Sequence, residues 1–333
     1  MVKNTDVAEK SGVSLSTVSR VLNHPELVQI DTRTRVLEVI QNLGYSPNLI
    51  ARGLATGNSG LVALLVPDIS DSSFGILARG CFDYFSTSGL TLALYNSDES
   101  LQKETEILKL VAERQIEGVI IFSNPEEVRT ELPKIMIPKV YIQRKPHHTF
   151  ADSVFIDNKQ AAYIACEHLL NLGHKKIGII TGPLYTLTGR ELLSYFTECL
   201  EKNGIALDEE FIIEGNYKAD SGEKAARQFL SLANKPTAIF VCSDITTYSF
   251  MATLQSNGIR IPDELSIISN VDLPMSAFTY PKLTTIHSPV YEQGLSAAKF
   301  LFDRLSNPKR PARKVILPVT LIIRESTGIY KGI

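Results

Sequence analysis

Residues 5–23, TDVAEKSGVSLSTVSRVLN, decide how the rest of the sequence is interpreted. Apolar residues recur at helical spacing on both sides of Gly12, namely at Val7, Ala8, Val13, Val18, Val21 and Leu22. Glycine suits a tight turn because it adopts backbone angles that are costly for other residues. The stretch therefore predicts two short helices joined at Gly12, with Ser14 as the N-cap of the second, from Leu15 to Leu22.

The second predicted helix carries, on its exposed face, the side chains that a DNA-reading helix needs: Leu15, Ser16, Thr17, Ser19 and Arg20. Short side chains let the helix N-terminus approach a major groove, and hydroxyls can bond phosphates or base edges. An arginine can bind guanine or a phosphate. The alternative is a small helical hairpin with a solvated face, because helix-turn-helix patterns also arise by chance.

A third helix is predicted from Thr32 to Leu43, capped by Asp31 and ended by Gly44. Its apolar stripe contains Val36, Leu37, Ile40 and Leu43. Residues 1–46 would then form a compact head. Six basic and five acidic residues lie in residues 1–52, so electrostatic attraction alone would hold this head to DNA weakly.

Residues 47–60 predict a short helix and a joint. Pro47 and Asn48 are typical of a helix start and Gly57 of its end, which leaves only about two turns. Helices shorter than roughly 12–15 residues are marginal in water, so this one should be ordered only when something holds it. The glycine-rich residues 57–60 indicate a flexible linker, which places a domain boundary near residue 60.

After residue 60 the pattern alternates between apolar strands and amphipathic helices, which predicts an α/β core of two doubly wound parallel sheets. Strands are predicted at 61–67, 90–96, 119–122, 139–143, 176–181, 211–215, 237–242, 266–272, 315–317 and 321–323. We expect one subdomain from about 61–157 with 290–319 and a second from 158–289 with 320–330. Ligands bind such sheets at the strands' carboxyl ends, here after Val66, Phe122, Thr181, Cys242 and Val271.

Composition favours a globular protein, and the lack of catalytic motifs favours one that is not an enzyme. Apolar residues make up 44% of the 333 residues, charged residues 21%, and the net charge is −2. The four cysteines are far apart, so no metal site or disulfide framework is expected. No apolar run approaches the roughly 18 residues that span a bilayer, which favours a cytoplasmic protein without membrane partners. No nucleophile elbow, P-loop or dinucleotide fingerprint occurs, so no cofactor is expected, and Asp68 and Asp71 are interpreted as turn caps.

The sequence resembles the lactose/galactose repressor family of bacterial transcription regulators along nearly its whole length. The head motifs that carry the resemblance are Asp6-Val7-Ala8, Gly12-Val13-Ser14, Thr17-Val18-Ser19-Arg20-Val21-Leu22-Asn23, Thr32-Arg33, Leu43-Gly44-Tyr45 and Pro47-Asn48. The core motifs are Pro67-Asp68-Ile69-Ser70, Leu172-Gly173-His174, Thr181-Gly182-Pro183, Leu283-Thr284-Thr285 and Arg324-Glu325-Ser326-Thr327. Their order and spacing, more than any single motif, carry the likeness.

The resemblance implies a homodimer whose heads bind two half-sites of a palindromic operator in double-stranded DNA. Leu15, Ser16 and Arg20 match the family's base-reading positions. The phosphate or structural contacts match Thr5, Thr17, Ser19 and Asn23. The segment after Pro47 matches a hinge helix that orders on DNA, with Asn48, Ala51 and Leu54 as contacts and Leu54 as the wedge between central base pairs.

The resemblance also implies an effector pocket between the two lobes of the core, whose closure changes DNA binding. The matching positions are Ser73, Phe74, Ser123, Asp157, Tyr217, Ser243 and Asp272. Where the family usually has a ligand-gripping arginine, this chain has Leu192, and Arg190 lies two residues earlier, about 200° away around a helix. The chain also has Asn270-Val271-Asp272 for the usual Gly-Phe-Asp. We therefore expect an unusual pocket and leave a sugar, a nucleoside and a phosphorylated metabolite open as effectors.

Three functions remain in view at this stage. The first is a repressor regulated by a small molecule. The second keeps the DNA-binding role but has a core that answers to a partner protein or corepressor. The third is a small-molecule receptor of the same two-lobed fold without a DNA function, against which the head counts heavily. The chain ends soon after residue 327 without a leucine-rich tail helix, so we expect a dimer rather than a tetramer.

Overall fold

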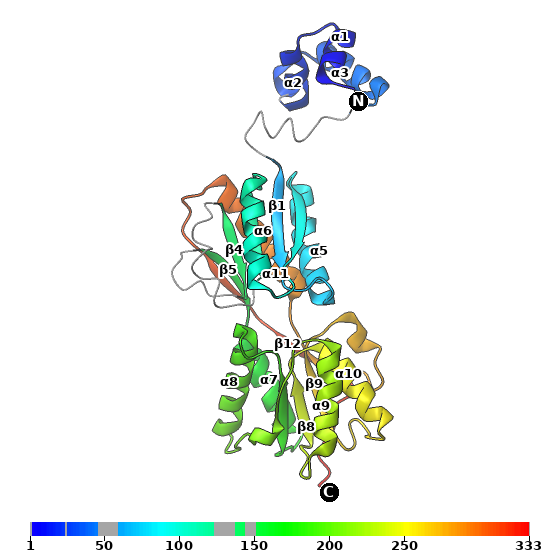
Figure 1. Ribbon diagram of the computed structural model, residues 1–333, viewed down its shortest axis with the longest axis vertical. Coiled ribbons are helices and arrows are strands. Elements are labelled where there is room, and N and C mark those ends of the chain that lie inside the picture. The colour runs from blue at the N-terminus through cyan, green and yellow to red at the C-terminus, as the bar shows by residue number, and fades with distance from the viewer. Residues whose placement is uncertain (1, 24, 46–58, 123–136, 144–150, 333) are drawn as a thin grey trace. The chain divides into compact units, whose positions relative to one another are not determined.

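The computed structural model describes residues 2–23, 25–45, 59–122, 137–143 and 151–332 of the chain (Figure 1). Contacts divide the chain into two compact units, Met1–Gly60 and Leu61–Ile333, which we call the head and the core. Four residues that the sequence singles out as contacts lie outside the described residues: Asn48, Ala51, Leu54 and Ser123. The two units are described separately below.

The head contains three α-helices, α1 (Asn4–Ser11), α2 (Leu15–Asn23) and α3 (Ile30–Leu43). Gly12 ends α1 with φ +66°, the left-handed angle that favours glycine, and this confirms the predicted turn. The small core of the head is formed by Val7, Ala8, Val18, Val21, Val36 and Tyr45. The Tyr45 hydroxyl donates to Asn4 Oδ1 at 2.6 Å and so joins the end of the head to α1.

Two details predicted for α3 were wrong. The helix begins at Ile30 with Gln29 in the N-cap position, so Asp31 lies inside the first turn. A carboxylate is favourable there as well, because it faces the positive end of the helix dipole, and this is why its sequence signal resembled a cap. Leu37, predicted to be in the core, is 42% exposed, and of the predicted stripe Val36 is fully buried.

The core contains two six-stranded sheets, ordered β11-β5-β4-β3-β1-β2 and β12-β10-β9-β8-β6-β7. The strands of the first sheet are β1 (Leu61–Val66), β2 (Thr91–Asn96), β3 (Gly118–Phe122), β4 (Lys139–Ile142), β5 (Asp152–Ile156) and β11 (Lys314–Leu317). The strands of the second are β6 (Ile177–Thr181), β7 (Ile212–Glu214), β8 (Ala238–Val241), β9 (Ser266–Val271), β10 (Thr284–His287) and β12 (Thr320–Ile322). Neighbouring strands are parallel except β10 and β12, so the prediction of parallel sheets is confirmed with one antiparallel edge.

Helices cover both faces of each sheet, because successive strand residues point to opposite sides. In the first sheet, one face packs against α5 (Ser72–Thr87) and α11 (Val290–Ser306), and the other against α6 (Leu101–Glu113). In the second sheet, α7 (Asn158–Asn171) and α8 (Leu187–Lys202) cover one face. Its other face is covered by α9 (Ala219–Ser231) and α10 (Asp244–Ser256) (Figure 1).

The sequence did not predict β5 and β10, because polar residues of these two strands are buried with specific partners. At the start of β5, Asp152 is fully buried and bonds Arg304 and Arg313. In β10, the backbone N–H of Thr284 donates to Ser326 Oγ at 2.8 Å, and Thr284 and Thr285 are both buried. The chain crosses between the sheets after β5, β10 and β11, and these crossings bring the carboxyl ends of both sheets together.

Candidate DNA-binding surface and ligand pocket

Helix α2 presents its polar side chains outward and its valines inward. Leu15, Ser16, Ser19 and Arg20 are exposed, with Leu15 at 51%, while Val18 and Val21 lie in the head's core. Thr17 is half-buried, and Thr5 of α1 is exposed. Asn23 is the last residue of α2. The described residues predicted to read bases therefore share an accessible helix face.

A cluster of hydroxyls holds the N-terminus of α2. Ser14 Oγ accepts from the backbone N–H of Thr17 at 3.2 Å, which confirms Ser14 as the N-cap. The same hydroxyl lies 2.7 Å from Ser16 Oγ and 2.9 Å from Thr17 Oγ1. The first backbone N–H groups of a helix have no partner within the helix, and the N-terminus is the positive end of the helix dipole. Both features favour anions, so the start of α2 can accommodate a phosphate.

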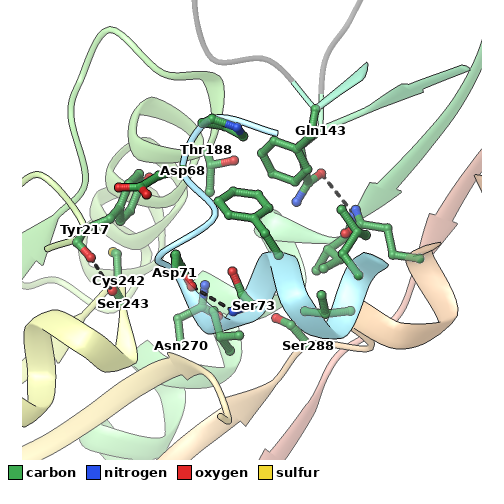
Figure 2. A pocket seen from close by; sticks show the side chains of 18 of the residues that line it. Asp68, Asp71, Ser73, Gln143, Thr188, Tyr217, Cys242, Ser243, Asn270 and Ser288 are labelled. Carbon is green, nitrogen blue, oxygen red and sulfur yellow. Dashed lines mark hydrogen bonds between the residues drawn. The ribbon is translucent and has the colours of Figure 1, made fainter. Parts of the chain in front are cut away.

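A pocket of about 140 Å³ lies in the core, where the carboxyl ends of strands from both sheets meet. Its walls include residues from the ends of β1, β3, β4 and β5 and from those of β7, β8, β9 and β10 (Figure 2). The lining consists of Pro67, Asp68, Asp71, Ser73, Phe74, Leu77, Glu99, Phe122, Gln143, Ile156, Asn158, Thr188, Asn216, Tyr217, Lys218, Cys242, Ser243, Asn270, Val271, Ser288, Val290 and Gln293. Both lobes therefore contribute to one site.

Four of the residues predicted to contact an effector line this pocket: Ser73, Phe74, Tyr217 and Ser243. Ser73 and Phe74 belong to the first turn of α5, whose N-cap Asp71 accepts from Ser73 N at 2.8 Å. Ser243 caps α10 and donates its hydroxyl to the Tyr217 carbonyl at 3.4 Å (Figure 2). The interpretation of Asp71 as a cap is confirmed.

The other predicted effector residues in the described chain do not line the pocket. Asp157 caps α7 by accepting from Gln160 N at 2.9 Å. Asp272 bonds Thr285 Oγ1 at 2.8 Å and lies 2.8 Å from Arg324 Nη1. Arg324, 52 positions later in the chain, therefore forms an ion pair with Asp272, and the Asp272 carboxylate already has partners within the core.

The departure at Leu192 has a structural explanation. Leu192 is fully buried in the hydrophobic cluster between α7, α8 and the second sheet, so its side chain is not available to a ligand. Arg190 does not replace the missing arginine, because its Nη1 donates to the carbonyls of Leu184 and Tyr185 at 3.1 and 2.9 Å. Within the described residues the pocket therefore contains Lys218 as its basic residue and no arginine.

Two pocket residues that sequence analysis did not assign are Asn270 and Gln293. Asn270 Oδ1 and Gln293 Nε2 are buried and have no hydrogen-bond partner among the described residues. Asn270 replaces the glycine of the usual Gly-Phe-Asp, and this substitution was the available signal. Gln293 lies in the first turn of α11, far from any motif, so the sequence contained no signal for its role in the pocket.

The backbone is strained around the pocket. Gln143, Tyr217, Val271 and Asp272 are non-glycine residues with φ of +51°, +63°, +105° and +66°. A β-branched residue such as Val271 rarely adopts a positive φ, and such strain tends to gather at ligand sites. Tyr217 also fills the space above Gly182, where an added Cβ would lie 1.8 Å from the tyrosine Cζ.

Acidic residues at the pocket link the two lobes. Asp68, after β1, lies 3.4 Å from Lys218 Nζ, at the N-cap of α9. A hydrogen bond from Ser70, with a smaller contribution from Lys218, lowers the pKa of Asp68. Glu99 accepts from the Tyr185 hydroxyl at 2.9 Å, and burial followed by this bond raises the pKa of Tyr185 to about 12.

Metal-ligand groups, disulfides and membrane-spanning helices do not occur in the described residues. No group of His, Cys, Asp and Glu there could hold a metal ion. The cysteines are all free and buried, and burial raises the pKa of the Cys81 thiol to about 12. Among these residues, no helix has both the length and the apolar character needed to cross a bilayer.

Comparison with known proteins assigns both units of the chain. Residues 5–48 match the model of bacterial regulatory proteins of the lacI family, and residues 166–327 match a periplasmic binding protein-like domain. Catabolite control protein A of Priestia megaterium is 34% identical over 97% of this chain and 98% of that protein. The transcriptional repressor PurR of Photobacterium profundum is 29% identical over 96% and 97%.

A solved structure gives the same assignment. The transcriptional regulator CelR in complex with cellobiose superposes with a TM-score of 0.75 at 26% identity, covering 98% of this chain and all of that one. The fold is therefore that of these regulators throughout. The chain belongs to the LacI family and is a DNA-binding transcriptional repressor with an effector-binding core, not an enzyme.

Proposed function

We propose that this repressor acts in the cytoplasm as a homodimer on a palindromic operator, with an affinity for DNA set by a small molecule in the core pocket. The observation that carries the proposal is the exposed face of α2, with Ser16, Ser19 and Arg20 on one accessible surface. We assign DNA reading to residues 1–46, the hinge to 47–60, and ligand binding and dimerisation to 61–333.

On this proposal the residues of α2 have different tasks. Leu15, Ser16 and Arg20 contact base edges, because all three side chains are exposed on α2. Thr17 is half-buried and bonds Ser14, whereas Ser16 is exposed, so the task of Thr17 is to order the helix start. Ser19 and the terminal Asn23 contact the phosphate backbone, which fixes the register of the helix without reading sequence.

The pocket supports a small-molecule effector because its walls come from both lobes. A ligand that contacts Phe74 of the first lobe and Tyr217 of the second stabilises the arrangement in which both are within reach. The Asp68–Lys218 and Glu99–Tyr185 contacts join the same lobes and should change with that arrangement. The solved complex of the regulator CelR with cellobiose is in keeping with a small organic effector.

Exposed apolar side chains support a homodimer. Met275, Phe278 and Tyr280 lie within a span of six residues and are 59%, 79% and 88% exposed. A soluble protein rarely leaves such side chains in water unless they meet a partner. Phe278→Asp should shift the protein from dimer to monomer in sedimentation velocity, while Glu210→Lys, on a different surface segment, should leave the dimer intact. A dimer that persists in Phe278→Asp would exclude this surface.

The DNA-binding proposal is tested by retention of palindromic duplexes from the neighbourhood of the gene at low salt. Arg20→Ala should weaken binding to the preferred duplex by about 1–3 kcal/mol and reduce its advantage over duplexes that differ at the position that Arg20 reads. Arg33→Ala removes the same charge from an exposed position on α3 and serves as the matched control. Equal loss of sequence preference in both variants, or no retained duplex for the intact protein, would refute the proposal.

A further inference from the structure

Two pocket side chains each have one buried atom without a hydrogen-bond partner among the described residues, and one of these atoms is an acceptor while the other is a donor. Asn270 is 6% exposed and its Oδ1 can only accept, whereas Gln293 is 1% exposed and its Nε2 can only donate. Both residues line the same pocket. A buried polar atom without a partner is costly, and a ligand that brings a donor to Asn270 Oδ1 and an acceptor to Gln293 Nε2 would satisfy both atoms.

The carboxylates of the pocket define the charge of that ligand. Asp68 has Lys218 and Ser70 as partners, and Glu99 has Tyr185. Asp71 accepts from Ser73, and no ion pair joins it to a cation in the described residues. Its burial raises the pKa of this carboxyl group, which reflects the cost of an unneutralised charge. A phosphate or carboxylate ligand would add a like charge beside three acids.

The apolar wall also suits a cation. Phe74 and Phe122 form an edge-to-face pair with ring centroids 4.9 Å apart, and both rings line the pocket with Tyr217. The negative face of an aromatic ring attracts a cation within about 6 Å. Gln143 uses its carbonyl to accept from Ile156 N at 3.1 Å (Figure 2). Its amide N–H groups remain available to a ligand, like the Nε2 of Gln293.

We infer that the pocket takes a small molecule bearing a positively charged amine and, at its other end, an oxygen acceptor such as a hydroxyl or carbonyl. The amine donates to Asp71 and Asn270 Oδ1 beside the aromatic rings, and the oxygen accepts from Gln293 Nε2. This inference rests on the proposed role of the pocket as the effector site and names the chemical class of the effector.

Ligands that share the glucose ring but differ in charge distinguish the effect of charge from the effect of shape. The full-length protein is melted with glucosamine, glucose or glucose 6-phosphate at equal millimolar concentration, and with ethanolamine and putrescine as short amines. At least one amine should raise the Tm, with an affinity about tenfold or more above that of its neutral counterpart, and glucose 6-phosphate should give no shift. The inference would be overturned if no amine raised the Tm, if glucose and glucosamine bound equally, or if glucose 6-phosphate bound more tightly than the amines.

Substitutions assign the recognition to named atoms. Asp71→Asn retains a good N-cap and removes the charge, so it should lower amine affinity about tenfold or more without lowering glucose affinity. Asp208→Asn is the matched control, because Asp208 also caps a helix by accepting a backbone N–H two residues on, at Glu210, but lies outside the pocket lining. It should leave amine affinity unchanged. Gln293→Leu should weaken every probe that carries the ring oxygens.

DNA retention by the same preparations separates this inference from the proposed function. Loss of amine binding with DNA retention intact would refute only the amine assignment. Amine binding by a protein that retains no duplex would instead refute the operator-binding role and leave the pocket chemistry standing. If Asp71→Asn and Asp208→Asn reduced amine affinity equally, Asp71 would have no specific part in recognition and the inference would fail.

Discussion

The head and the pocket show two ways of building a binding site from one chain. The face that we propose reads DNA belongs to α2, a helix of nine consecutive residues, and a short hydroxyl cluster caps the start of this helix. The pocket instead takes residues from Pro67 to Gln293, held together by two sheets and three chain crossings. The first site is a local property of sequence, and the second exists only after the core has folded.

The largest effect that should distinguish the two regions is the pH dependence of the core. Asp244, at the start of α10, is 1% exposed, and burial raises its pKa to about 7 despite hydrogen bonds from Ser269, Leu273 and Ser276. Its pKa when unfolded is the ordinary 3.8. Because the pKa of Asp244 is higher in the folded than in the unfolded protein, protonation of Asp244 stabilises the core. This stabilisation is complete below the unfolded pKa and is lost as the pH rises through 7.

Asp244→Asn should remove this loss. Between pH 5 and pH 8, the free energy of unfolding of the unmodified core should fall by about 3 kcal/mol more than that of the variant. Urea unfolding at several pH values measures the difference. A constant difference across this range would mean that the three hydrogen bonds hold the carboxylate ionised and that Asp244 does not weaken the core.

A substitution behind the pocket should damage the core and spare the head. In Gly182→Ala the new Cβ would lie 1.8 Å from Tyr217 Cζ, so the tyrosine must leave its place and the core should lose about 1–3 kcal/mol. Gly75→Ala in α5 is the control, because nothing lies within 4 Å of its added Cβ. Thermal melting and ligand titration should show loss only in Gly182→Ala. Equal behaviour of the two would show that the Tyr217 contact is dispensable.

The converse substitution should damage the head and spare the core. Ser14→Ala removes the acceptor for Thr17 N and should cost about 1 kcal/mol of head stability. Ser14→Asn supplies another capping oxygen and should restore most of it. Operator affinity and the melting of each unit are measured together. A loss of core stability in Ser14→Ala would contradict the separation of the two units.

The smallest effect concerns the salt dependence of DNA binding. Six basic and five acidic residues lie within residues 1–52, so each head has an excess of one positive charge. The logarithm of the binding constant should fall with the logarithm of salt concentration less steeply than for proteins that neutralise about six to ten phosphates. Fluorescence anisotropy from about 50 to 200 mM salt measures the slope. A slope as steep as theirs would show that charge balance does not limit backbone contacts.

The same contrast explains how much the sequence could predict. The helices of the head, the cap at Ser14 and the alternating core all follow from local signals, namely periodicity, turn residues and capping chemistry. β5 and β10 were missed because Asp152 and Thr284 are buried by partners far along the chain. No local pattern reports such pairing.

The pocket was predictable only where a family motif marked it. Ser73, Phe74, Tyr217 and Ser243 stand in motif positions and line the cavity. Asp272 stands in one too, yet Arg324 engages it from the far end of the core. Gln293 has no signal, because its role arises from the first turn of α11 meeting the carboxyl ends of both sheets. The asparagine at position 270, where the family usually has glycine, indicates that the site differs from the usual one but does not predict which ligand it binds.

Selection of duplexes from a random DNA library tests most directly whether α2 decides what this repressor binds. The intact protein should enrich a palindrome of two half-sites, and Arg20→Ala should enrich a palindrome that has lost its preference at one symmetric pair of positions. Arg33→Ala should return the original sequence. Enrichment of no palindrome, or of the same one by the Arg20→Ala variant, would contradict the assignment of DNA reading to this helix.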